Sequence, residues 1–384
     1  MSKFPPSLKS LLFGFVLLFL TSSGFAQHYT QTNLVSNTGA GLNDPNLQNA
    51  WGLVSAPVVP GVLPNGTPWW ISNNAAGTST LYSIKVTNNQ FAASIVPING
   101  NGIVNIPNAP SQQGLGSPTG VMFNGSPTDF LLPSGQAALF LFVTEDGTVQ
   151  GWAGGAAATV VVDHSQVPNA AHGAVYKGST IAEIGGKHFL LAANFRSGRI
   201  DVFDSHFRQV RLSEDAFEDE RIPHGFAPFN VQGIGPNIYV TYARQDAARH
   251  DPVGGAGFDF VDVFTSNGRL VQRLEHGPWL NAPWGAVWAT PGFGEFSNTI
   301  LIGQFRGGNI AAFNPVTGRF LGNVLNPDGT TLAIDGLWAL RFGNDGASGP
   351  ATTLFFTAGP NGEKDGLFGI LTPVAAEGAE ADEQ

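Results

Sequence analysis

The sequence contains no cysteine, which excludes disulfide bonds, thiolate metal sites and cysteine nucleophiles. Charged residues are also scarce: they make up 12% of the chain, where about 25% is usual in soluble domains. So low a charge content argues against a charged disordered chain. The formal net charge is −10, so we do not expect a nucleic acid as a partner.

Long hydrophobic runs are missing as well. The longest apolar stretch is the run at residues 11–20, which is too short to cross a bilayer as a helix. It follows Lys3 and Lys9 and leads to small residues that end at Ala26, a pattern typical of a secretory signal. A buried N-terminal helix is the alternative. We therefore predict a signal peptide over residues 1–26 and a mature protein that is secreted or periplasmic, soluble, and free of the membrane after cleavage.

Glycine and proline are plentiful, with 50 and 26 residues. Both disfavour long helices, so helical bundles and coiled coils are excluded. Hydrophobic residues make up 42% of the chain and aromatic residues 11%, enough for a large core. The length after cleavage suits one large all-β domain. We predict that this domain covers residues 27–374 and that residues 375–384 form a disordered acidic tail.

A repeat of short apolar strands runs through the chain. Its units open with a small or aromatic residue followed by a strand, and the equivalent opening residues are Trp51, Thr119, Gly173, Phe229, Trp284 and Trp338. The spacings are 68, 54, 56, 55 and 54 residues. A period of this length with several strands per unit is typical of propeller blades, so the sequence predicts a six-bladed β-propeller. A β-sandwich is the alternative.

The last repeat holds only three strands, and the mature N-terminus offers a spare one at residues 28–35. We predict that this strand joins the last blade and closes the ring. The innermost strands need small residues where they crowd at the axis, which Gly52, Gly120, Ala174, Gly285 and Ala339 would provide. Trp51, Trp284 and Trp338 are expected to pack between blades, with a stacking platform for a ligand as the alternative.

Several segments carry a resemblance to a known family. They are the Ala-Pro-Phe-Asn-Val-Gln stretch at 227–232 and residues 239–243, 280–285, 334–338, 356–360 and 366–369. On these segments the chain resembles a family of exported bacterial six-bladed propellers without an assigned activity. More distantly it is similar to the NHL-repeat and gluconolactonase-like propellers. The resemblance implies the same fold and export; relatives often carry a His where this chain has Asp365.

Polar residues in the loops around the channel mouth are the candidates for chemistry. Asparagine and aspartate oxygens converging on the axis are suitable ligands for Ca²⁺, and Asn230, Asn281 and Asp335 are the candidate metal ligands. Glu145 is the candidate general base of a metal-dependent hydrolase. The alternative is that these side chains cap turns by bonding nearby backbone groups.

Three arginines occupy equivalent places in successive repeats: Arg196, Arg244 and Arg306. Guanidinium groups gathered on one rim suit a carboxylate or a phosphate. The alternative is ion pairing with Asp146 or Asp246. His172 lies before an innermost strand and is a further candidate ligand-binding residue, unless it is a hydrogen-bonded structural histidine.

Motifs of other enzyme classes do not occur: the chain has no HExxH, no GxSxG and no Walker loop. The sequence therefore predicts a monomeric binding or interaction module that holds a small molecule, a carbohydrate or a protein on the channel-mouth face. The alternative is a Ca²⁺-dependent lactone or ester hydrolase of the gluconolactonase type.

Overall fold

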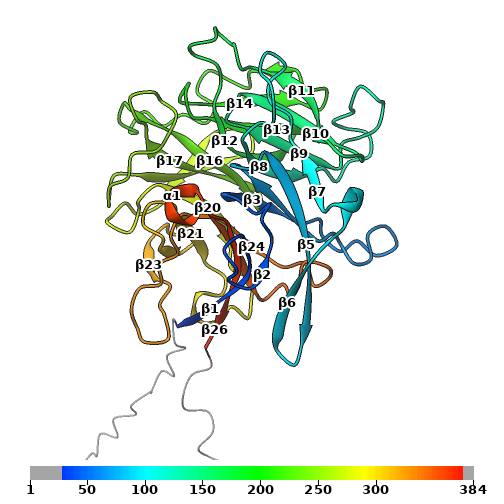
Figure 1. Cartoon of the computed structure of the whole chain (residues 1–384). Helices are drawn as coiled ribbons and strands as arrows, with labels where there is room; N and C mark the ends of the chain where they lie inside the picture. Colours follow the sequence, from blue (N-terminus) through cyan, green and yellow to red (C-terminus); the bar gives the residue numbers. More distant parts are fainter. Residues whose placement is uncertain (1–27, 375–384) are drawn as a thin grey trace, which may run out of the picture.

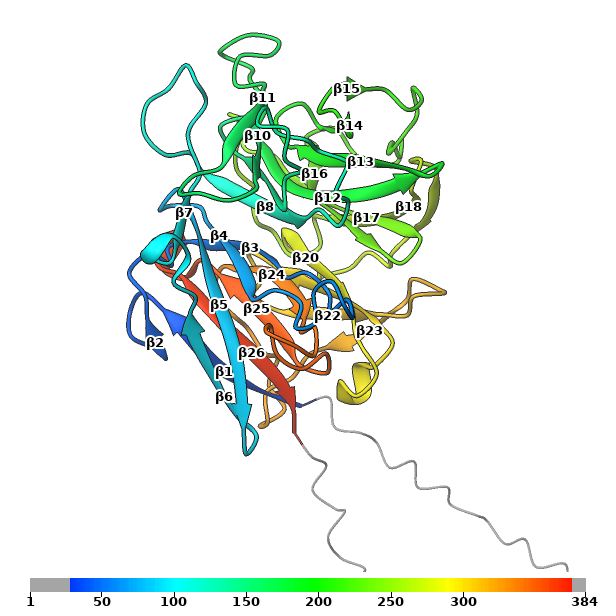
Figure 2. The ribbon, with the colours of Figure 1, turned by 90° about the vertical axis from the view of Figure 1, so that its right-hand side faces the viewer.

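The computed structural model describes residues 28–374. The predicted signal peptide and acidic tail lie outside the described residues. Within them the chain forms six sheets arranged around a central axis as the blades of a propeller (Figures 1 and 2), and the named strands pair antiparallel except for β1 with β2. The innermost strand of each blade contacts the innermost strands of both neighbouring blades, so the six strands form a closed ring. The prediction of a six-bladed β-propeller is confirmed.

The first three blades follow one another along the chain. Blade 1 runs outward from the axis as β3 (Ala50–Val54), β4 (Trp69–Asn73), β5 (Thr78–Thr87) and β6 (Gln90–Ile95), with β7 (Ile103–Asn105) also paired to β5. Blade 2 consists of β8 (Pro118–Phe123), β9 (Phe140–Thr144), β10 (Thr148–Trp152) and β11 (Thr159–Asp163). Blade 3 consists of β12 (Tyr176–Ile184), β13 (Lys187–Asn194), β14 (Arg199–Asp204) and β15 (Gln209–Val210).

The other three blades complete the ring. Blade 4 consists of β16 (Phe226–Ile234), β17 (Asn237–Arg244), β18 (Phe260–Thr265) and β19 (Leu270–Arg273). Blade 5 consists of β20 (Pro283–Trp288), β21 (Ile300–Gln304), β22 (Ile310–Phe313) and β23 (Phe320–Asn323). Blade 6 consists of β24 (Leu337–Phe342), β25 (Leu354–Ala358), β26 (Leu367–Pro373), β1 (Tyr29–Ser36) and β2 (Leu42–Asn43).

The N-terminal strand closes the ring as predicted. β1 pairs antiparallel with β26 from Tyr29 opposite Pro373 to Ser36 opposite Leu367, and the two strands lie side by side in both views (Figures 1 and 2). The short helices are η1 (Ile98–Gly100), η2 (Gly294–Phe296) and α1 (Pro360–Glu363). No helix among residues 28–374 has the length and apolar character needed to cross a membrane.

Every innermost strand carries a register shift at the same place, where it pairs with the second strand of its blade. The residues inside these bulges are, in blade order, Trp51-Gly52, Thr119-Gly120, Lys177-Gly178, Phe229, Trp284-Gly285 and Trp338-Ala339. The small residues let neighbouring blades approach: a Cβ on Gly52 would lie 2.3 Å from the Thr119 carbonyl oxygen. Ala174 was predicted for blade 3, but the structure places Gly178 there.

Apolar side chains fill the spaces between neighbouring blades, with one cluster for each of the six interfaces. The cluster between blades 6 and 1 extends to the axis. There Trp51 stacks on Trp338 with ring centroids 3.6 Å apart, and Trp338 stacks on Phe305 at 3.8 Å. Trp284 meets both tryptophans edge-on. The three tryptophans therefore pack between blades, as predicted. They also contact one another at the axis.

Candidate functional site

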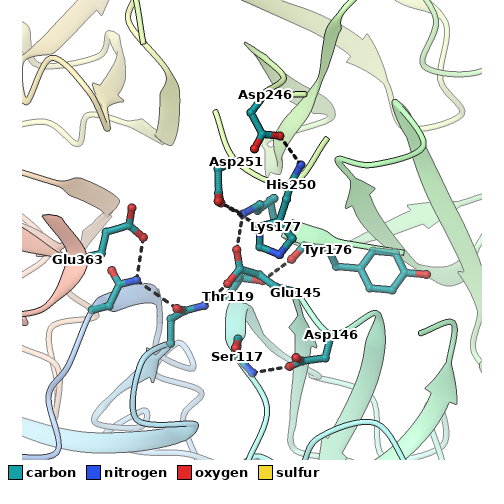
Figure 3. Close-up of polar contacts among 12 residues, drawn as sticks. Ser117, Thr119, Glu145, Asp146, Tyr176, Lys177, Asp246, His250, Asp251 and Glu363 are labelled. Atoms are coloured by element: carbon teal, nitrogen blue, oxygen red, sulfur yellow. Dashed lines mark hydrogen bonds and ion pairs between the residues drawn. The ribbon is translucent and has the colours of Figure 1, made fainter. Parts of the chain in front are cut away.

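The loops between the second and third strands of the six blades are topologically equivalent and meet on one face of the ring. We call this face, with the loops that enter the innermost strands, the loop face. The channel mouth on this face lies directly over the axial aromatic cluster. Polar side chains from five blades form a continuous hydrogen-bonded network here, centred on Lys177 (Figure 3).

Lys177 occupies in blade 3 the bulge position that Trp51 occupies in blade 1. Its side chain is fully buried, and its ammonium lies 5.2 Å from the ring centroid of Trp51 and 5.9 Å from that of Phe195. The ammonium donates to Glu145, from the β9–β10 loop, and to Asp251 Oδ1 at 3.1 Å, from the β17–β18 loop. Two carboxylates and two aromatic faces therefore compensate the buried charge.

The electrostatics of the cluster keep Lys177 and Asp251 charged. Burial by itself lowers the pKa of Lys177, but the Glu145 and Asp251 carboxylates outweigh it and hold that pKa above its ordinary value. The hydrogen bond from His250 lowers the pKa of Asp251, and Lys177 lowers it further. The same bond raises the pKa of His250. Around pH 7 the Lys177 ammonium and the Asp251 carboxylate at the centre of the network are therefore both charged.

From Glu145 the network continues toward blades 1 and 6. Asn74 donates to Glu145 Oε2 at 2.7 Å, and Asn49 donates to Asn74 Oδ1 at 3.2 Å and to Glu363 Oε2 at 3.0 Å. Asn49 in turn accepts the indole N–H of Trp338 at 2.9 Å. Burial raises the pKa of the Glu363 carboxyl, and the charge of Glu145 adds to this effect. The network thus ties the mouth to the aromatic cluster below it.

Glu145, His250 and Asp251 bring potential metal-ligating atoms within 4.8 Å of one another. However, the Lys177 ammonium already bonds to both carboxylates of this group. A divalent cation in the same place would have to compete with a buried, fully charged ammonium. The group is better described as a compensated ion cluster than as a metal centre.

The side chains of the three predicted calcium ligands each bond to backbone groups. Asn230 is buried on β16, where its Oδ1 accepts the N–H of Val231 at 2.8 Å and its amide donates to the Trp284 carbonyl at 2.7 Å. Asn281 Oδ1 accepts a backbone N–H from Gly255 at 2.8 Å, and Asp335 Oδ2 accepts one from Asn361 at 2.9 Å. Each oxygen thus bonds to backbone at a separate place. The calcium set stays a prediction that this hydrogen bonding does not favour.

The three predicted arginines lie where the second strand leads into the third in blades 3, 4 and 5: Arg244 is the last residue of β17, and Arg196 and Arg306 follow the ends of β13 and β21. Arg196 donates to the Gly173 carbonyl at 2.9 Å, and its Nε has no hydrogen-bond partner among the described residues. Arg244 lies over the ring of Phe258 and Arg306 over that of Phe305. Within residues 28–374 none of the three forms an ion pair with a carboxylate.

His172 lies away from the network. Its ring Nδ1 bonds to Asn169 Oδ1 at 2.9 Å, and the side chain is exposed in the loop before β12. Glu145 lies at the channel mouth, where the sequence placed it, and its role as a general base stays a prediction. Sequence reasoning missed Lys177, His250 and Asp251. The available signal was a lysine beside a glycine at the start of an inner strand.

Comparisons with known proteins place the chain among viral relatives, although no family model matches it. It is 31% identical over 354 residues to the uncharacterised protein R648 of Acanthamoeba polyphaga mimivirus, covering 88% of this chain and 78% of that protein. The uncharacterised protein L690 of the same virus is 29% identical over 350 residues, covering 85% and 81%.

Solved structures share the fold at low sequence identity. A structural genomics protein of unknown function from Bacteroides thetaiotaomicron superposes with a TM-score of 0.50 at 11% identity, over 90% of this chain and 76% of that one. An α-L-arabinanase of Penicillium chrysogenum, complexed with arabinobiose, gives 0.49 at 14% identity, over 89% and 98%. The first of these likenesses supports the propeller fold and nothing further.

The expected membership of a bacterial family is wrong, because the relatives found by sequence are mimivirus proteins. The segments that carried the resemblance lie largely on inner and second strands, such as β16 and β17, where the propeller itself demands small and apolar residues. Similarity in such segments indicates a shared fold but does not identify the organism. The chain belongs to the family of the uncharacterised mimivirus protein R648.

Proposed function

We propose that this protein is an interaction module that binds an anionic ligand on its loop face. The propeller fold is compatible with an interaction module. The observation that carries the proposal is the set of three arginines, Arg196, Arg244 and Arg306. They lie at equivalent places where the second strand leads into the third in three consecutive blades, and none has a carboxylate partner among the described residues. Guanidinium groups that are not paired within the protein are suited to a carboxylate or phosphate.

The other side of the same mouth has the opposite character. Glu363 and Glu145 lie in the equivalent loops of blades 6 and 2, and Asn49 and Asn74 hold their carboxylates in place. These groups favour a ligand that also offers hydrogen-bond donors, such as hydroxyl or amine groups. A carbohydrate that carries carboxylate groups combines both features. We therefore propose an acidic carbohydrate as the ligand class.

Aromatic side chains fill the axis of the ring, which supports binding of a ligand on the loop face rather than its passage through the ring. Directly beneath the network, Trp51, Trp338 and Phe305 form a continuous stack. All three side chains are almost completely buried. A ligand at the mouth would thus rest on a floor that packing and hydrogen bonds have already ordered, which lowers the entropic cost of binding.

The experiment is a calorimetric titration of the mature chain with oligogalacturonate and, in parallel, with a neutral oligosaccharide of equal length. The triple variant Arg196→Gln, Arg244→Gln, Arg306→Gln removes the proposed contacts. Its matched control is Arg208→Gln, Arg269→Gln, Arg319→Gln, which changes exposed arginines in the third-to-fourth strand turns of the same three blades.

We expect binding of the acidic oligosaccharide by the wild type and by the control. We also expect a loss of at least tenfold in affinity in the first variant, and weaker binding at high salt. No binding of the acidic oligosaccharide, or equal binding by both triple variants, would overturn the proposal. Equal affinity for the neutral oligosaccharide would also count against it, because the arginines would then not select the ligand.

A further inference from the structure

A second polar site lies inside the ring, on the opposite side of the aromatic cluster from the loop face. The innermost strands line a partly open cavity of about 10 Å³, the space that one water-sized group needs. Gly52, Gly120 and Gly285 contribute to its wall, together with the polar residues Ser179, Gln232 and Arg341.

Arg341 brings a positive charge to this cavity without a negative partner. Its guanidinium donates to the Ala286 carbonyl at 3.4 Å and to the side-chain oxygen of Gln232. Both acceptors are neutral, and Arg341 forms no ion pair within residues 28–374. Its contacts cross the channel, from β24 in blade 6 to β20 in blade 5 and β16 in blade 4. Burial lowers the pKa of Arg341 to about 10, with no carboxylate to oppose the effect.

Two further groups that line the cavity are hydrogen-bond donors without partners. The hydroxyl of Ser179 is buried and has no hydrogen-bond partner among the described residues. The indole N–H of Trp284 is likewise buried and unpartnered. In contrast, the amide groups that line the same cavity are engaged: Asn230 donates to the Trp284 carbonyl, and Gln232 donates to the Gly233 carbonyl. The unsatisfied groups around this space are thus all able to donate.

We propose that this cavity binds a small inorganic monoanion of halide size, with Arg341 supplying the opposite charge and Ser179 and Trp284 supplying donors. An anion accepts hydrogen bonds from every side, whereas a water molecule would have to direct two of its own protons toward a site already rich in donors. The Arg341 guanidinium is partly buried and has no charged partner among the described residues, and a bound anion would compensate its charge. A phosphate or a carboxylate is too large for this space.

The two anion sites are separate. The loop-face site uses Arg196, Arg244 and Arg306 and faces solvent, while the inner site uses Arg341 and accepts a single atom. Neither proposal depends on the other, because no residue is shared and the aromatic cluster lies between them.

The test is the thermal unfolding of the mature chain in sodium chloride, sodium bromide and sodium gluconate at equal ionic strength. Chloride and bromide are expected to raise the melting temperature by roughly 2 °C or more over gluconate, which cannot enter the cavity. The variant Arg341→Met is expected to lose this halide dependence, and the exposed-residue control Arg269→Met is expected to keep it.

A crystal of the wild-type protein grown in bromide provides the second readout, since it does not require the variant to fold. Anomalous scattering from a bromide beside Arg341 would support the proposal. No anomalous signal in the cavity, with a water molecule there instead, would overturn it. Equal melting temperatures of the wild type in chloride and gluconate, or an equal halide effect in Arg341→Met, would overturn it as well.

Discussion

The ammonium of Lys177 lies over the ring of Trp51, and the two residues hold the same bulge position in blades 3 and 1. One position of the repeat thus supplies the aromatic floor of the channel mouth in one blade and its central charge in another. The lysine also bonds to carboxylates from the blades on either side of its own. The network at the mouth is therefore part of what holds blades 2, 3 and 4 together.

Replacing Lys177 by methionine should destabilise the protein strongly. Glu145 would keep Asn74 as a partner but lose the charge that compensates its own, and an uncompensated carboxylate in a buried site costs about 3–5 kcal/mol. Urea unfolding measures the change. The double variant Lys177→Met, Glu145→Gln removes both charges and should recover part of the loss. A single variant as stable as the wild type would show that the ion cluster contributes nothing to the fold.

Much of the fold could be predicted from the sequence, because the propeller repeats a local pattern. Blades 1, 2, 4, 5 and 6 open at the residues predicted for them, and β1 closes the ring. Blade 3 was misjudged by four residues. His172-Gly173 has the small-residue pattern of an opening, but the inner strand begins at Tyr176 and its axial residue is Lys177.

The centre of the candidate site could not be found in the same way. A lysine at a fully buried axial position contradicts the hydrophobic pattern, and it is tolerated only because two carboxylates meet it there. Those partners lie 32 and 74 residues away in the sequence. Their convergence depends on how three blades are stacked around the axis, which spacing along one chain does not reveal.

The stability of the protein should be greatest near about pH 4 and fall as the pH rises to about 6. Burial raises the pKa of Asp259 and of Asp262 to about 6, so folding favours their protonated forms. Their contribution is complete below the unfolded pKa of about 4, and it is lost as the pH rises through 6. Below pH 4 the stability instead falls as the pH falls, because hydrogen bonds from Arg221 lower the pKa of Asp219 to about 2.

Urea unfolding midpoints measured from pH 3 to pH 8 check this profile. Asp262→Asn should flatten the decline between about pH 4 and pH 6, while Arg273 keeps its ion pair with Asp219. Asp328→Asn, at an exposed position, is the control and should leave that decline unchanged. A wild-type protein whose stability increases steadily from about pH 4 to pH 6 would contradict the prediction.

Removing β1 should unfold the ring or leave it barely stable. The strand buries Tyr29, Leu34 and Val35 and covers the hydrogen-bonding edge of β26. Three large buried side chains are worth on the order of 5 kcal/mol together. The comparison is between a chain that begins at His28 and one that begins at Asn37, followed by circular dichroism during heating. Tyr29→Phe, which removes only the bond to the Phe293 carbonyl, should have a small effect. Equal melting temperatures for the two chains would show that the closure is dispensable.

Calcium should leave the stability of the protein unchanged. Ligand that binds only the folded state raises the melting temperature, so a calcium site would separate the curves in EDTA and in millimolar Ca²⁺. We expect the curves to coincide, because the oxygens of Asn230, Asn281 and Asp335 are bonded to backbone at separate places and Lys177 neutralises the carboxylates at the mouth. A higher melting temperature in Ca²⁺ that Asp335→Ala abolishes would contradict this expectation. It would favour the hydrolase over the binding module. An increase in melting temperature that persists in Asp335→Ala but is lost in Glu145→Gln would place the cation beside Glu145 at the channel mouth. Lys177 would then have to move away from Glu145 to admit it.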